Sequence, residues 1–147
     1  MNFLIKTTNT QNIFRIILGS FMILTAFGHF TFLRIEWQSQ VPNWIPLDKN
    51  LVVILSGIVE LTIGLSMLFL TKYKSYVGWL LALFYLLIFP GNIAQYINKD
   101  DFAGLNSDTA RFIRLLFQPI LIGCALWSTG AWKAWRQHRL TLKKSKI

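Results

Sequence analysis

Four stretches of about twenty mostly apolar residues constrain the fold of this chain more than any other feature of its sequence. A helix rises about 1.5 Å per residue, so roughly twenty residues cross the hydrocarbon core of a bilayer, which is about 30 Å thick. Within lipid, a helix satisfies its backbone hydrogen bonds internally. We therefore expect four membrane-spanning helices, at about residues 12–33, 51–70, 75–97 and 111–130.

The expected fold is all-α, a transmembrane four-helix bundle that forms one integral membrane domain over residues 1–147. The composition agrees, because 54% of the residues are hydrophobic and only 14% are charged, outside the usual range of soluble domains. Pro90 and Gly91 should kink or end the third span, since proline lacks a backbone donor. The candidate N-caps are Asp48 or Asn50 for the second span and Ser107 or Asp108 for the fourth.

The placement of basic residues predicts the orientation, because cytoplasmic flanks of spanning helices are rich in Lys and Arg. With both termini and the turn at 71–74 inside, the inner segments hold ten basic residues and no acidic one, whereas the outer segments hold five of each. We expect a multi-pass protein of the bacterial cytoplasmic membrane with both termini cytoplasmic. The basic tail, residues 131–147, then lies on lipid headgroups, which accounts for the net charge of +9 without a nucleic-acid partner.

Five polar residues inside the spans are candidate site residues, because an ionisable group at membrane depth costs several kcal/mol unless it is paired or neutralised. Glu60 is tenth in its span and hence near the midplane. The other four lie a few residues inside the outer ends of their spans, and they are His29, Asn92, Arg114 and Gln118. We expect them to meet in the outer half of the bundle.

Helical spacing predicts that these side chains point inward. In the second span Gly57 and Gly64 share a face with Glu60, and Ser56 lies one turn before it, so another helix can approach closely. The inward faces expected for the first and fourth spans carry Gly19, Met22, Ala26 and His29, and Arg111, Arg114 and Gln118.

Three states are open to Glu60: it pairs with Arg114, it accepts a hydrogen bond from His29, or it stays protonated and neutral. The whole cluster is either a functional pocket or a set of interhelical hydrogen bonds that holds the bundle together. The proline-rich loop at 41–48 carries Trp44, and this loop either covers the pocket or is a plain connector.

Metal binding is not expected. His29 lacks companion ligands, because His138 belongs to the tail and Cys124 lies toward the inner side of the fourth span. As the only cysteine, Cys124 cannot form a disulfide within the chain, and it is best interpreted as a packing residue.

Five short motifs occur in order, and together they resemble the DoxX-like family of small four-helix membrane proteins. They are AFGHF (26–30), VPNWIP (41–46), SGIVELTIG (56–64), FPGNI (89–93) and RLLFQP (114–119). The resemblance falls on Gly28, His29, Pro42, Pro46, Ser56, Gly57, Glu60, Gly64, Pro90, Asn92, Arg114, Gln118 and Pro119. The chain departs from the family pattern at Gly91, where alanine is expected, and in RLLFQ, which no proline interrupts.

The resemblance implies a left-handed-type four-helix bundle and a short list of functions. The family takes its name from a subunit of a thiosulfate:quinone oxidoreductase, its members are linked to membrane redox complexes, and related four-helix proteins help other membrane proteins to assemble. A quinone is the one cofactor that the resemblance suggests. The sequence itself shows no Gly-rich nucleotide loop and no other evident cofactor motif.

We therefore expect an accessory or ligand- or partner-binding membrane protein with an outer-facing polar pocket, rather than a stand-alone enzyme. The alternatives are a membrane subunit of a quinone-linked oxidoreductase and a proton or small-solute path built on Glu60. The expected partners are the lipid bilayer and a membrane or redox protein, and homo-oligomers are also compatible with the sequence. The pocket candidates are His29, Glu60, Asn92, Arg114, Gln118, Ser56 and Trp44.

Overall fold

The computed structural model describes residues 5–100 and 107–144, and within these ranges it contains helices and no strand. The elements are α1 (Asn9–Phe30), α2 (Arg34–Gln38), α3 (Lys49–Phe69), the short 3-10 helix η1 (Thr71–Tyr73), α4 (Lys74–Asn98), α5 (Asp108–Ser128) and α6 (Ala131–Lys144). Four of them, α1, α3, α4 (preceded by η1) and α5, are long and apolar enough to cross a membrane. The predicted all-α class is confirmed, and the described residues contain the four long apolar helices that the sequence predicts as spans. Asp101 and Lys146, which entered the charge count, lie outside the described residues.

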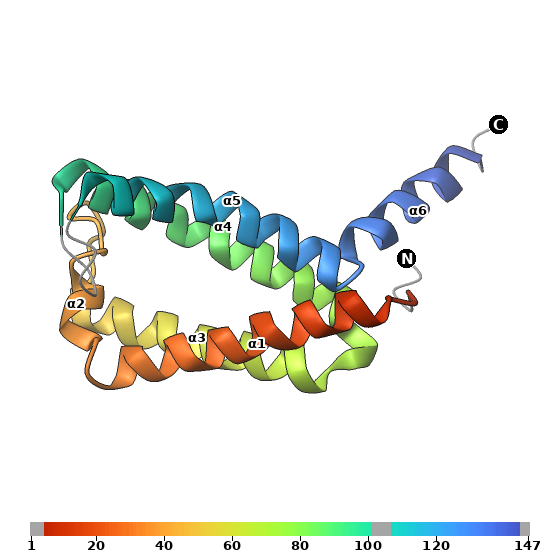
Figure 1. The fold of residues 1–147 in the computed structure, drawn as a ribbon, viewed down its shortest axis with the longest axis horizontal. Coiled ribbons are helices and arrows are strands. Elements are labelled where there is room, and N and C mark those ends of the chain that lie inside the picture. The colour runs from red at the N-terminus through yellow and green to blue at the C-terminus, as the bar shows by residue number, and fades with distance from the viewer. Residues whose placement is uncertain (1–4, 101–106, 145–147) are drawn as a thin grey trace.

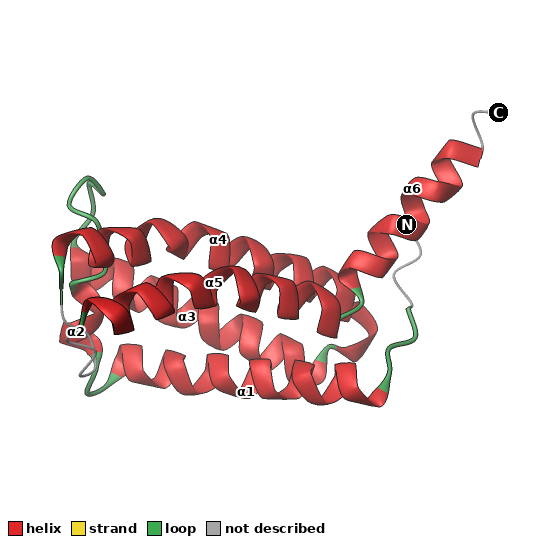
Figure 2. Cartoon of the chain, turned by 45° about the horizontal axis from the view of Figure 1, so that its top comes forward, coloured by secondary structure: helices red, strands yellow, loops and turns green. Residues whose placement is uncertain are grey.

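The four long helices form two antiparallel pairs, α1 with α3 and α4 with α5, which stack to make the bundle (Figures 1 and 2). At one end of the bundle lie α2 and the loop that follows it, and at the other end lie the start of α1, η1 and the start of α6. The polar candidates sit toward the end that carries α2.

The outside of the bundle is apolar, as a lipid-facing surface must be. Large hydrophobic side chains are exposed along every long helix, for example Leu24 (68%), Leu87 (68%) and Phe117 (52%). Soluble monomers rarely expose contiguous apolar surface on this scale. The structure therefore agrees with a membrane protein.

The helix ends follow local capping chemistry. Asp48 caps α3 by accepting a hydrogen bond from the Leu51 amide, and Ser107 caps α5 in the same way. At the start of α1, Thr8 and Gln11 form a reciprocal capping box. The expected end of the first span at residue 33 is wrong, because α1 ends at Phe30 and the chain turns there into the unpredicted helix α2.

The proline and glycine of the third span do not end it, since α4 continues through Pro90 to Asn98. The Pro90 side chain is exposed, and membrane helices tolerate a missing amide donor where neighbouring groups compensate. Gly91 instead accommodates the loop after α2, because a Cβ there would lie 2.7 Å from the backbone oxygen of Gln40. This contact holds the loop against α4.

An apolar core fills the half of the bundle farther from α2. Met22, Met67 and Leu81 are its most deeply buried large side chains, each with at most 2% of its surface exposed. Beyond this core, toward the end of the bundle opposite α2, the Arg15 guanidinium donates to the backbone oxygens of Met67 and Leu68, near the C-terminus of α3. A cation there satisfies carbonyls that have no helical partner and faces the negative end of the helix dipole.

The two helices α1 and α3 approach each other closely where both carry glycine. A Cβ on Gly64 would lie 2.9 Å from the backbone oxygen of Gly19, and a Cβ on Gly19 would lie 2.9 Å from Cβ of Met67. Small residues let membrane helices pack backbone against backbone. The predicted inward face of α1 is buried at Gly19, Met22, Ala26 and His29.

Replacing Gly64 by alanine should separate α1 from α3 and destabilise the bundle, because the new methyl group meets a backbone oxygen that cannot move alone. We expect a loss of about 1–3 kcal/mol, typical of overpacking, seen as a lower thermal midpoint of the purified protein in detergent. Gly123→Ala is the matched control, since a Cβ at that position meets nothing within 4 Å. An equal effect of the two substitutions would contradict the proposed close contact.

Candidate functional site

Glu60 lies at mid-length of α3 with 5% of its surface exposed, facing the interior of the bundle. Its neighbour one turn earlier, Gly57, has no side chain, and a Cβ there would lie 2.8 Å from Cβ of His29. Because α1 can come this close, His29 enters the space beside Glu60. Its Nε2 lies 3.4 Å from Oε1 of Glu60, within ion-pair range but outside hydrogen-bond geometry.

The contacts of the other ring nitrogen orient the His29 side chain. Its Nδ1 lies 3.0 Å from the backbone oxygen of Val53 and 3.1 Å from Oγ of Ser56. The Ser56 hydroxyl also donates to the Val53 carbonyl oxygen. These contacts fix the imidazole ring so that its Nε2 faces Glu60.

The carboxyl group of Glu60 thus faces an imidazole nitrogen, a group that can exchange a proton with it. Oε2 of Glu60 is buried and has no hydrogen-bond partner among the described residues. An unsatisfied buried oxygen is costly and is an attachment point for a donor from a ligand or water.

Arg114 does not pair with Glu60, although such a pair is one of the three states expected for this glutamate. Nη2 of Arg114 donates to Oε1 of Gln40 at 2.8 Å, and its guanidinium carbon lies 5.7 Å from the ring centroid of Trp37. Trp37 in turn stacks on His29, with ring centroids 4.2 Å apart and 19° between the planes. Trp37, from the short helix α2, thus connects His29 of α1 with Arg114 of α5.

Asn92 and Gln118 form a second buried group between α4 and α5. The Asn92 side chain donates to Oε1 of Gln118 at 2.8 Å, and Gln118 donates to the backbone oxygen of Tyr85 at 2.7 Å. The Tyr85 hydroxyl donates to the sulfur of Met22. These bonds connect α4 with α5 and Tyr85 with α1, so this group holds the helices together as interhelical hydrogen bonds do.

Two cavities meet around Glu60, and both also border Trp37, Gln40 and Ile88. The first, about 140 Å³, lies between His29 and Ser56 and the loop after α2. The second, about 170 Å³, extends to Arg114 and Gln118. An apolar cavity of about 150 Å³ holds one benzene-sized ring. Each space therefore has room for one small ring.

The loop after α2 forms one wall of the first cavity through Val41, Pro42, Trp44 and Ile45. Trp44 is otherwise 72% exposed, so it contributes to the wall only at its edge. Nε2 of Gln40 is buried without a hydrogen-bond partner among the described residues. Besides the acceptor on Glu60, the cavity therefore presents a donor on Gln40.

The structure brings all seven candidates to the walls of these two cavities. His29, Ser56, Glu60 and Trp44 line the first, and Glu60, Asn92, Arg114 and Gln118 line the second. Sequence reasoning missed Trp37 and Gln40. The one feature of the sequence that points to them is their position, since an aromatic and an amide side chain follow the predicted first span at its outer end. Within residues 5–100 and 107–144, no group of three or more His, Cys, Asp or Glu is placed to hold a metal ion.

Trp37→Ala should destabilise the protein by about 2 kcal/mol, because it removes a ring that contacts both His29 and Arg114. Trp44→Ala is the matched control, and since that side chain is mostly exposed we expect a change of no more than about 0.5 kcal/mol. Thermal unfolding of both variants in the same detergent measures the difference. Equal midpoints would contradict the bridging position of Trp37.

Comparison with known proteins gives one match. The family model described as a domain of unknown function (DUF8561) matches residues 18–129, a range that contains all the cavity residues named above. No curated protein and no solved structure matches the chain. Because the match covers more than half of its length, the chain belongs to the DUF8561 family.

Proposed function

We propose that this protein is a ligand-binding accessory protein of a bacterial cytoplasmic membrane, with both termini in the cytoplasm and the pocket toward the outer face. The proposed ligand is a small, mainly apolar molecule whose hydrogen-bond donor faces Glu60 and whose acceptor faces Gln40. Oε2 of Glu60, a buried oxygen without a partner among the described residues, carries the proposal. The charge asymmetry of the chain supports the orientation.

The size and lining of the cavities support a ring-sized apolar ligand. Most of the wall of the first cavity comes from Val52, Val53, Leu87, Ile88 and the loop after α2. Small-molecule sites are typically apolar with a few placed polar groups that fix orientation. A ligand with one polar edge matches this arrangement, and the rest of a longer molecule would extend into the bilayer.

The same site is less suited to carry protons or solutes across the membrane. Between Glu60 and Arg15 lies the apolar core around Met22, Met67 and Leu81. A path through the bundle needs polar groups or water along its length. We therefore propose that Glu60 binds a ligand in the pocket rather than carrying protons across the membrane.

The test of ligand binding compares three variants of the full chain. Glu60→Leu removes the acceptor, Glu60→Gln keeps an oxygen that can face the cavity, and Glu36→Leu changes an exposed glutamate near the same end. A hydrogen bond to a charged group contributes about 1.5–3 kcal/mol, so we expect at least a tenfold loss of bound ligand for Glu60→Leu. Glu60→Gln should lose no more than about threefold, and the Glu36 variant should match the wild type.

Bound molecules are measured by purifying each variant from native membranes, extracting it with organic solvent and quantifying the extract by mass spectrometry. The proposal expects one molecule in near-stoichiometric amount in the wild type. A wild-type extract without such a molecule, or equal amounts in Glu60→Leu, would rule out the pocket as a ligand site.

A quinone is the second candidate ligand, and one observation favours it. The imidazole of His29 and the carboxyl group of Glu60 are two groups that can transfer protons, and both lie beside a ring-sized cavity. A quinone ring needs protons when it is reduced. The resemblance to the DoxX-like family supports the same role, in which the protein is the membrane subunit of a quinone-linked oxidoreductase. Electrons would come from a partner protein.

If the ligand is a quinone, the organic extract should contain it in stoichiometric amount, and added quinone should raise the thermal midpoint of wild-type protein but not of Glu60→Leu. An extract that holds a different molecule, together with an unchanged midpoint on adding quinone, would exclude the oxidoreductase role and leave the ligand-binding role in place.

A further inference from the structure

The last helix carries a concentration of charge that the pocket does not use. In α6 there are five basic residues and no acidic one, and Figure 1 shows the helix leaving the bundle obliquely. It begins directly after Gly130, whose φ of 69° lies in the left-handed region that favours glycine. Gly130 therefore sets the turn between α5 and α6 at the end of the bundle opposite α2.

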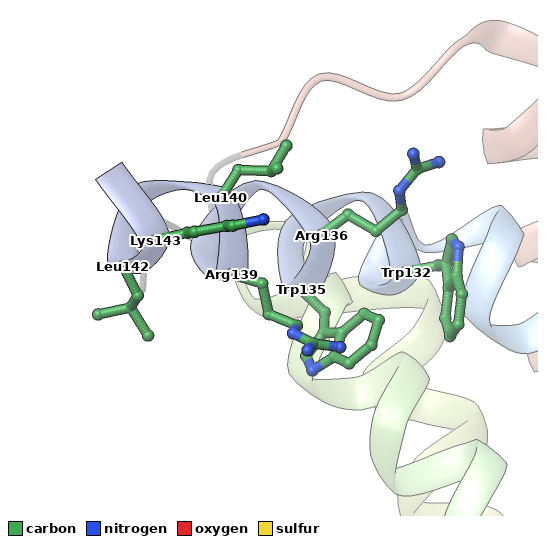
Figure 3. Close-up of a pocket in the computed structure, with 7 residues that line it drawn as sticks. All are labelled: Trp132, Trp135, Arg136, Arg139, Leu140, Leu142 and Lys143. Carbon is green, nitrogen blue, oxygen red and sulfur yellow. The ribbon is translucent and has the colours of Figure 1, made fainter. Parts of the chain in front are cut away.

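Aromatic and basic side chains share one side of α6. Trp132, Trp135, Arg136 and Arg139 are spaced three or four residues apart and so fall on one helix face. The Arg139 guanidinium lies over the Trp135 ring at 4.9 Å, and the rings of Trp132 and Trp135 are 5.0 Å apart (Figure 3). With Lys143 and others they border a surface hollow of about 580 Å³.

A second hollow, of about 500 Å³, runs from this face onto the side of α5. It is bordered by Gly123, Leu126 and Trp127 from α5, by Lys133 of α6, and by Trp132, which borders both hollows. Trp127 is held in place by α1, since its backbone oxygen accepts from Gln11 at 2.7 Å and its ring meets Phe14 edge-on at 5.4 Å. Gly123 leaves the wall open on α5.

The chemistry of the two hollows matches the charged headgroup and the apolar acyl chains of a lipid. The one on α6 is cationic and has indole rings, which favour the headgroup level of a bilayer. The one on α5 is apolar and lies along a helix long enough to cross the hydrocarbon core. Anionic headgroups attract clustered Lys and Arg beside a membrane span, at about 1 kcal/mol for each charge near the surface.

We propose that this face of α6 and the adjoining side of α5 form a binding site for an anionic phospholipid. The headgroup phosphate lies against Arg136 and Arg139, with Trp132 at the level of the glycerol, and an acyl chain runs along α5 past Gly123. The site is separate from the pocket at Glu60 and does not depend on the function proposed for that pocket.

The test titrates full-length protein in neutral detergent with phosphatidylglycerol or phosphatidylcholine of identical chains and measures bound lipid by native mass spectrometry. We expect the wild type to prefer phosphatidylglycerol and the double variant Arg136→Gln/Arg139→Gln to bind it about thirtyfold more weakly, with phosphatidylcholine unchanged. Lys72→Gln/Lys144→Gln removes the same charge at exposed positions outside both hollows and should stay within about threefold of the wild type.

The acyl groove has its own variant, Gly123→Leu, which fills open space without changing charge and should weaken binding of both lipids. Inorganic phosphate at millimolar concentration should not displace bound phosphatidylglycerol, because it cannot occupy the groove. Equal losses in the two double variants would show unspecific attraction between charges and overturn the site. Displacement of the lipid by phosphate would also overturn the site. So would the finding that Arg136 and Arg139 are needed to bind a short DNA duplex but not to bind the lipid.

Discussion

The close contact between α1 and α3 is the constraint on which the site depends. Glycines at 19 and 64 let the two backbones meet, and Gly57 lets the His29 side chain settle beside Glu60. A buried carboxyl group at this depth is expensive without a polar neighbour, and the close approach of α1 supplies one in His29. The packing of these two helices therefore determines which polar groups face each other in the site.

The second requirement is a link between the two helix pairs, and α2 provides it. His29 and Glu60 belong to the first pair, Asn92 and Gln118 to the second, and each set is bonded mainly within its own pair. Trp37 contacts His29 on one side and Arg114 on the other. The cavities lie where the two pairs and this short helix meet, and their shape depends on how α2 sits.

Much of the architecture follows from local sequence, while the partners of the polar residues do not. Twenty-residue apolar runs, Asp48 and Ser107 as caps, and the small-residue faces depend on chemistry within a few turns of helix, so pattern alone predicts them. Depth along the helix places both His29 and Arg114 within reach of Glu60 and cannot choose between them. The choice depends on which helix approaches α3 most closely and on Gln40, which lies in a loop. Trp37 belongs to a five-residue helix, too short to show a period.

The position of His29 beside Glu60 also has an electrical consequence. A proton that passes between Nε2 and Oε1 travels at most about 3.4 Å, roughly a tenth of the hydrocarbon thickness, whereas a charge that crosses the whole membrane gains about 2.3 kcal/mol per 100 mV. In a chain that spans a membrane, the transmembrane voltage therefore changes the free energy of such a proton transfer by no more than about 0.3 kcal/mol at 100 mV. Proton transfer within this pair is nearly insensitive to the membrane voltage.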